Sequence, residues 1–177
     1  GINDSAFFRF TVEQVAKQPQ PFFTTVFNIS THYPYVIPEK YRSVFPKGNT
    51  AASQSVSFLD RALQLFFEEA KKSSWYNNTL FVFTADHWNK EDPTLKADGS
   101  GIYQIPLFIY KPDGSLKQTI TGVTDQLSIF PTLMHLTGYT HKFNSFGSSV
   151  LNLQPERQWT VAVKQWPGLL LFTTTDT

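Results

Sequence analysis

The stretch that decides the fold is Asn77-Asn78-Thr79-Leu80-Phe81-Val82-Phe83-Thr84-Ala85-Asp86-His87. Its residues 80–83 form a short apolar run, rich in aromatic and β-branched side chains and preceded by a turn-forming asparagine pair. Such a run is typical of a strand covered on both faces, as in a parallel sheet flanked by helices. Ligands of open α/β sheets bind beyond the carboxyl ends of the strands, so Asp86 and His87 follow the strand where chemistry is expected.

A second apolar run covers residues 22–30 and is followed at once by Thr31-His32-Tyr33-Pro34. Between the two runs, residues 51–72 carry apolar side chains at helical spacing, which predicts the helix of a β-α-β crossover. We expect the two strands to be parallel. His32 and Asp86 would then open onto the same sheet edge, within roughly 10–12 Å of each other even if one strand intervenes.

The rest of the chain predicts further elements of an α/β domain. We expect a first helix from a cap at Asp4 or Ser5 to about Gln18, and a short helix capped by Ser128 and closed by Gly138. A strand is expected over 105–110, and the runs 159–163 and 169–173 predict an antiparallel hairpin. The predicted fold is α/β, a mostly parallel sheet flanked by helices, with a small C-terminal antiparallel hairpin.

Composition limits the function. The 177 residues, of which 41% are hydrophobic, suffice for one domain with a real core. The net charge is +1 and the basic residues are scattered, so we expect no nucleic-acid partner. The absence of cysteine excludes disulfides, thiolate metal sites and a cysteine nucleophile within the chain. No apolar run approaches the roughly 18 residues of a membrane helix.

Three residues are candidates for chemistry, and each has a plainer alternative. A carboxylate and an imidazole such as Asp86 and His87 suit Mg²⁺, Mn²⁺, Ca²⁺ or Zn²⁺; alternatively, Asp86 caps a turn and His87 is a surface residue. His32 suits a donor to an anionic substrate or a general acid. Its alternative is a loop histidine packed among neighbouring tyrosines.

The order of the motifs resembles the sulfatase superfamily, and most closely its lipoteichoic acid synthase and phosphoglycerol transferase branch. The resemblance is carried by residues 21–35, 75–87, 104–112 and 125–139, and runs from about Gly1 to Leu151. It implies an alkaline-phosphatase-like fold, with residues 1–155 as the C-terminal part of a catalytic domain. Residues 156–177 would be the hairpin of a small accessory sheet in the same domain.

By position in these motifs, the resemblance implies that Asp86 and His87 are metal ligands and that His32 is the catalytic residue that contacts substrate. The implied cofactor is a divalent metal, Mn²⁺ or Mg²⁺, or Ca²⁺ in a true sulfatase. The implied substrate is an anionic phosphate or sulfate ester, and the implied parent is an extracytoplasmic, membrane-anchored bacterial enzyme. A true sulfatase and a degenerate, non-catalytic binding module stay open as alternatives.

The nucleophile that the resemblance calls for is not found in the sequence. No proline has Ser or Thr two residues before it, and there is no Thr-Ser-Asp. We therefore expect a remaining N-terminal part of the catalytic domain to supply the nucleophile and the other metal ligands. The chain alone should be inactive and should not retain the metal.

Overall fold

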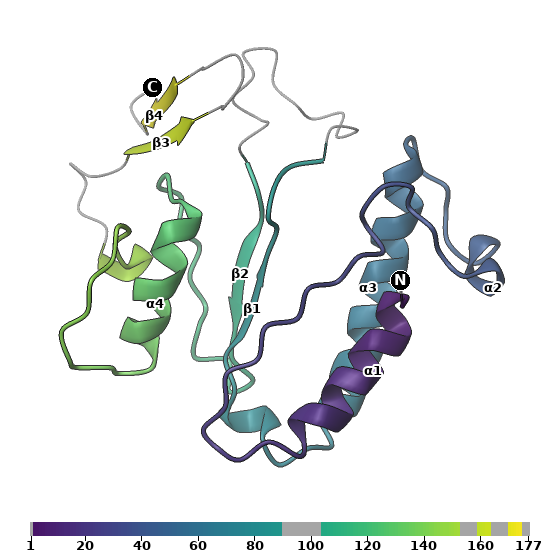
Figure 1. The fold of residues 1–177 in the computed structure, drawn as a ribbon, viewed down its shortest axis with the longest axis horizontal. Helices are drawn as coiled ribbons and strands as arrows, with labels where there is room; N and C mark the ends of the chain where they lie inside the picture. Colours follow the sequence, from purple (N-terminus) through teal and green to yellow (C-terminus); the bar gives the residue numbers. More distant parts are fainter. Residues whose placement is uncertain (1, 90–103, 153–158, 164–169, 175–177) are drawn as a thin grey trace. The chain divides into compact units, whose positions relative to one another are not determined.

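The computed structural model describes residues 2–89, 104–152, 159–163 and 170–174 (Figure 1). The chain forms two compact units. The first unit comprises residues 1–94 and 105–116, and the second comprises residues 95–104 and 117–177. All three predicted site residues belong to the first unit.

The first helix is α1 (Asp4–Val15), and its cap precedes the two expected cap residues. Asn3 is the N-cap, and its side-chain oxygen accepts a hydrogen bond from the backbone N–H of Ala6 at 3.2 Å. The expected cap at Asp4 or Ser5 is wrong, because Asp4 lies inside the helix and its carboxylate binds another part of the chain. The apolar residues Phe8, Val12, Val15 and Ala16 recur at helical spacing and predict one buried face; Phe8, Val12 and Val15 are buried, whereas Ala16, at the C-cap, is exposed.

The long helix α3 (Ala51–Ala70) is present as expected, capped by the Thr50 side chain. Its most buried stripe is Ala52, Ser55, Phe58, Ala62 and Ala70. Val56, one of the apolar residues at helical spacing on this helix, is 53% exposed. Most of the buried residues are small, which allows close packing of α3 against its neighbours.

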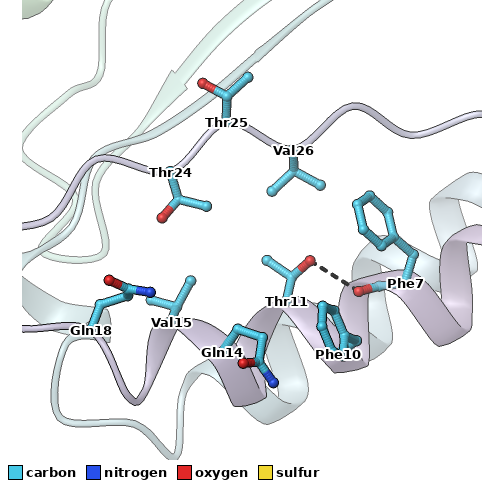
Figure 2. Close-up of a pocket in the computed structure, with 9 residues that line it drawn as sticks. All are labelled: Phe7, Phe10, Thr11, Gln14, Val15, Gln18, Thr24, Thr25 and Val26. Carbon is cyan, nitrogen blue, oxygen red and sulfur yellow. Dashed lines mark hydrogen bonds between the residues drawn. The ribbon is translucent and has the colours of Figure 1, made fainter.

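Residues 22–30 follow α1 and run back along it, and Figure 2 shows the side chains of Thr24 and Val26 pointing toward the helix and that of Thr25 pointing away. The segment is extended, but in the described part of the chain it is not paired into a strand. Its odd-numbered apolar residues point outward: Phe23 is 86% exposed and Phe27 72%. The expected buried strand is thus an extended segment with one open face, because a strand needs a neighbour to complete its hydrogen-bond ladder.

The strand β1 (Phe81–Thr84) pairs with β2 (Leu107–Tyr110), and the pairing is antiparallel. Phe81 is opposite Tyr110, and Phe83 is opposite Phe108. The expected parallel pairing of residues 80–83 with 22–30 is therefore not present in the described residues, although both segments lie in the first unit.

The core of the first unit is aromatic. Phe81 is buried, and its ring centroid lies 5.1 Å from that of Phe67 on α3 and 5.6 Å from that of Tyr76 in the short 3-10 helix η1 (Tyr76–Asn78). Val12 and Val15 of α1 belong to the same buried cluster. This core anchors the start of β1 and leaves its carboxyl end, which leads to Asp86, at the surface.

A short helix, α2 (Glu39–Arg42), interrupts the loop between the extended segment and α3. The prolines and tyrosines of residues 33–48 predict an irregular loop, and a helix of four residues is too short to show a helical periodicity in the sequence. Gly48 ends this loop with φ +63°, where an added Cβ would collide with the Ser53 side chain. Glycine is therefore required at the turn into α3.

The second unit contains the 3-10 helix η3 (Gln126–Ser128), α4 (Ile129–Leu136) and the 3-10 helix η4 (Val150–Asn152). Ser128 is the N-cap residue of α4 as expected, but its side chain makes no capping hydrogen bond. Instead, the carboxylate of Asp125, the N-cap of η3, accepts hydrogen bonds from the Ser128 N–H and Oγ, each at 2.9 Å. Gly138, with φ +70°, closes the helix as expected.

The strands β3 (Trp159–Val163) and β4 (Leu170–Thr174) pair antiparallel, which confirms the predicted hairpin pairing. Its connection, residues 164–169, lies outside the described residues. The proposed domain boundary at residue 155 stays a prediction.

Candidate functional site

Asp86 and His87 follow β1 directly, at a bend where the chain leaves the strand. Their side chains lie close together: the Nε2 of His87 is 3.7 Å from the Oδ2 of Asp86. Both are open to solvent, with 58% of the Asp86 side chain and 65% of the His87 side chain exposed. The Asp86 Oδ1 also accepts a hydrogen bond from the His87 N–H at 3.0 Å.

The His87 ring is oriented by its own backbone neighbour. Its Nδ1 lies 2.6 Å from the carbonyl oxygen of Trp88. A carbonyl can only accept, so Nδ1 carries the hydrogen, and Nε2 is the nitrogen left to bind a cation. Metal-binding histidines are commonly fixed in this way, by donating the second ring N–H to a carbonyl.

His32 lies in the turn that follows the extended segment, and its side chain is exposed. Its N–H donates to the carbonyl of Ile29 at 3.0 Å, and its carbonyl accepts from the N–H of Tyr35 at 2.8 Å. The His32 Nδ1 lies 2.7 Å from the carbonyl oxygen of Tyr33, so here too Nδ1 is the donor, and in the neutral ring Nε2 is the acceptor.

The loop after His32 and the loop after His87 are joined by a direct hydrogen bond. The Tyr35 hydroxyl donates to the Oδ1 of Asn89 at 3.3 Å, although the two residues are 54 positions apart. Tyr35 also has φ +59°, a left-handed conformation that costs a non-glycine residue roughly 1–2 kcal/mol. Strained backbone of this kind clusters at functional sites.

The sequence does not indicate that Tyr35 and Asn89 are in contact. Tyrosine and asparagine are common in polar loops, and the spacing of these two residues in the sequence predicts no hydrogen bond between them. The shared edge expected for His32 and Asp86 is consistent with the hydrogen bond, whereas the roles of His32, Asp86 and His87 stay predictions.

Two cavities adjoin the extended segment and its loop. A groove of about 170 Å³ lies between α1 and residues 24–26 (Figure 2) and contains none of the three predicted site residues. A larger cleft of about 430 Å³ lies beside Tyr35, and its lining includes Arg42, Lys47 and the start of α3. The larger cleft thus combines positive charge with a residue that contacts the Asn89 loop.

In the described part of the chain, no group of three or more His, Asp or Glu side chains could hold a metal ion. No described helix has both the length and the apolar character needed to cross a membrane.

Comparison with known proteins identifies the family. A family model described as sulfatase matches residues 1–139. The chain is 27% identical to lipoteichoic acid synthase 2 of Bacillus subtilis (strain 168), over 86% of this chain and 26% of that protein. It is 25% identical to lipoteichoic acid synthase of Staphylococcus aureus (strain USA300), with the same coverage of 86% and 26%. The chain therefore spans about a quarter of the length of these relatives.

Among solved structures, the chain is similar to a protein in the alkaline phosphatase superfamily from Vibrio parahaemolyticus. The TM-score is 0.75 at 27% identity, and the match covers 91% of this chain and 40% of that one. The similarity confirms the predicted alkaline-phosphatase-like α/β fold class. The match of the family model to most of the chain, together with this shared fold, shows that the chain belongs to the sulfatase family.

Proposed function

We propose that this chain is the C-terminal part of the catalytic domain of a metal-dependent enzyme that transfers or hydrolyses phosphoglycerol or other phosphate esters. The parent would act outside the cytoplasm at the bacterial cell envelope, anchored in the membrane. The observation that carries the proposal is the Tyr35–Asn89 hydrogen bond, which joins the His32 loop to the Asp86–His87 loop. The likeness to lipoteichoic acid synthases supports the phosphate-ester branch.

Asp86 and His87 would be the part of the metal site that this chain supplies. Two ligands that each lie about 2.1 Å from one ion can be at most about 4.2 Å apart. The observed 3.7 Å between Asp86 Oδ2 and His87 Nε2 fits that limit. Carboxylate oxygen and imidazole nitrogen suit Mn²⁺ or Mg²⁺, or Ca²⁺ in a sulfatase. When bound, such an ion activates a hydroxyl nucleophile and neutralises charge on the transferred group.

His32 would contact the substrate. Its Nδ1–H donates to the Tyr33 carbonyl, so only the protonated ring has a second N–H, at Nε2, to donate to an ester oxygen. A donor aimed at the charge that develops on the phosphate or on the departing oxygen stabilises the transition state. The exposed position of His32 leaves it accessible to an anionic ester.

The cleft beside Tyr35 would receive the rest of the anionic substrate. Arg42 and Lys47 supply positive charge there, and the Arg42 guanidinium is also paired with Glu39 at 2.8 Å. The pair is exposed, so Arg42 can exchange this partner for a phosphate at little cost.

The remaining N-terminal part of the catalytic domain would cover the open face of residues 22–30. Phe23, Phe27 and Ile29 are exposed on one side of an extended segment, which is the arrangement of a strand that lacks a covering layer. The relatives contain three quarters of their length outside the region matched by this chain, enough to supply that layer and the nucleophile.

The test of function uses the complete catalytic domain of the parent protein with a glycerophospholipid and an aryl sulfate as substrates. We expect transfer or hydrolysis of the phosphate ester, with losses of about 100-fold or more in His32→Ala, Asp86→Ala and His87→Ala. His141→Ala, an exposed histidine in the second unit, is the matched control and should keep full activity.

Turnover of the aryl sulfate alone would instead identify a true sulfatase. Tight binding of the glycerophospholipid, with no turnover of either substrate, would identify a degenerate binding module. Full activity of the Asp86→Ala variant would contradict the proposed metal role.

The covering role is tested separately, by adding the N-terminal part as a second polypeptide. We expect association with the 177-residue chain, weakened strongly by Phe27→Glu because a buried unpaired charge is costly. Phe146→Glu, at a fully exposed position of the second unit, should bind like the unaltered chain. Equal binding by all three chains would exclude the 22–30 face as the contact.

A further inference from the structure

Asp4 is a fully buried carboxylate with no part in the chemistry proposed for His32, Asp86 and His87. It is the first residue of α1, yet none of its side chain is exposed, and Asn3 already caps the helix. A buried carboxylate is costly unless hydrogen bonds replace its lost water. The partners that replace this water therefore indicate what Asp4 does.

The Asp4 carboxylate accepts its hydrogen bonds from residues 28–30, just before the His32 turn. The Oδ1 accepts from the backbone N–H groups of Ile29 and Ser30, each at 3.1 Å, and the Oδ2 accepts from the Nδ2 of Asn28 at 3.0 Å. In return, the Asp4 N–H donates to the Ser30 Oγ at 3.2 Å. Hydrogen bonds to an ionised acceptor are roughly twice as strong as neutral ones.

Apolar packing contributes little to holding residues 27–30 against α1. The side chains of Phe27 and Ile29 are 72% and 51% exposed, so they contribute little burial. Further back, the groove between α1 and residues 24–26 separates the segment from the helix (Figure 2). The Asp4 hydrogen bonds therefore form the firm attachment between α1 and the end of the segment.

The segment held by Asp4 is hydrogen-bonded to the backbone of His32. The carbonyl of Ile29, whose N–H is bound by Asp4, accepts the hydrogen bond from the His32 N–H. Ile29 therefore joins the buried carboxylate on one side to the backbone of the proposed catalytic histidine on the other. The His32 carbonyl in turn accepts from Tyr35, whose hydroxyl contacts Asn89.

We propose that Asp4 is a positioning residue for His32. Its carboxylate fixes the backbone of Ile29 and Ser30. Through the turn from Ile29 to His32, it thereby determines the position of the His32 imidazole. The catalytic meaning of this placement rests on the proposed function, whereas the placement itself is measured without any activity.

The first experiment follows the histidine ring signals of the 177-residue chain by NMR. Asp4→Ala should shift the ring signals of His32 and the amide signals of Ile29 and Ser30, while the rings of His135 and His141 stay unchanged. Asp4→Asn keeps one oxygen that can accept from both N–H groups, and should restore the His32 signals. Asn28→Ala removes only one donor and should shift His32 less, in the same direction.

Thr11→Val is the matched control for general destabilisation. Thr11 is buried on the same helix, and its hydroxyl donates to the Phe7 carbonyl at 2.9 Å rather than to residues 28–30. We expect it to lower the melting temperature and leave the His32 signals in place. Unmoved His32 signals in both Asp4→Ala and Asn28→Ala would overturn the proposal, as would an equal shift in Thr11→Val. If Asp4→Ala does not fold, an unmoved His32 in Asn28→Ala still overturns it.

The second experiment measures kcat and KM in the complete catalytic domain. Misplacement of a catalytic group by about 1 Å can cost 100-fold in rate, so Asp4→Ala should lower kcat by about 10- to 100-fold. In a His32→Ala background the same change should have no further effect. A full additional loss in that background would overturn the positioning role. Shifted NMR signals with unchanged kcat would leave the positioning intact and contradict the catalytic role of His32.

Discussion

The Tyr35 hydroxyl donates a hydrogen bond to the Oδ1 of Asn89 at 3.3 Å, and it joins two loops that carry different parts of the candidate site. One loop holds His32 and the other holds Asp86 and His87. A neutral hydrogen bond of this kind contributes about 1 kcal/mol, which is enough to bias two surface loops towards one arrangement.

Tyr35→Phe should therefore loosen the two loops together. We expect the amide signals of His32 and His87 both to shift, with a loss of about 1 kcal/mol in the free energy of unfolding. NMR and urea denaturation of the 177-residue chain measure the two effects. Tyr139→Phe, in the second unit, is the control. Signals of the Asn89 loop that stay in place would show that the hydrogen bond does not couple the loops.

Metal binding by the chain alone should be weak and should depend on Asp86. A hard divalent ion uses more ligands than Asp86 and His87 provide, with water filling the rest. Calorimetry with Mn²⁺ should give an affinity weaker than micromolar that is lost in Asp86→Ala and kept in Asp60→Ala, an exposed aspartate of α3. Micromolar or tighter binding that Asp86→Ala abolishes would show that the chain holds a complete site.

Asp113, in the turn after β2, should titrate at unusually low pH. The hydrogen bond from Lys111 at 2.7 Å, helped by those from Ser115, lowers the pKa of its carboxyl from 3.8 to about 2. The ionised form is favoured by folding, so the contribution to stability is present above pH 3.8 and is lost as the pH falls towards 2. Lys111→Met should move the NMR titration midpoint of Asp113 upward, whereas Lys71→Met should not.

Tyr76 should stay protonated well into the alkaline range. Burial, and then the hydrogen bond with the Tyr110 hydroxyl at 3.0 Å, raise the pKa of Tyr76 to about 12. The protonated form is favoured by folding, so this contribution is complete below the ordinary value of 10.0 and is lost as the pH rises through about 12. Tyrosinate absorbance, compared between the chain and Tyr76→Phe, isolates this titration. Tyr110→Phe should lower its midpoint, and an unchanged midpoint would show that burial alone is responsible.

Phe81→Ala should be the most damaging change in β1. The buried ring packs against Phe67 and Tyr76, and truncation of a core phenylalanine costs about 3–5 kcal/mol. Phe108→Ala, at a position that is 64% exposed on the paired strand, should cost about 0.5 kcal/mol. Urea unfolding of the two variants makes the comparison, and equal losses would mean that the aromatic cluster does not hold the sheet.

The sequence by itself determined the local elements and the order of the motifs. α3, the apolar stripe of α1, the core strand β1 and the C-terminal hairpin all follow from periodicity within a short stretch. The adjacency of Asp86 and His87 after β1 was likewise readable, because a strand followed by polar residues needs no distant partner to be recognised.

Only the tertiary structure decided which faces are buried and which loops meet. Asp4 and Asn3 are equivalent as caps by residue type, and the choice depends on Ile29 and Ser30 some 25 positions away. Whether residues 22–30 form a strand depends on a neighbour, because an extended chain completes its hydrogen bonds only with another chain segment. The Tyr35–Asn89 contact depends on how the whole first unit folds, since no local pattern fixes a distance between residues far apart in the sequence.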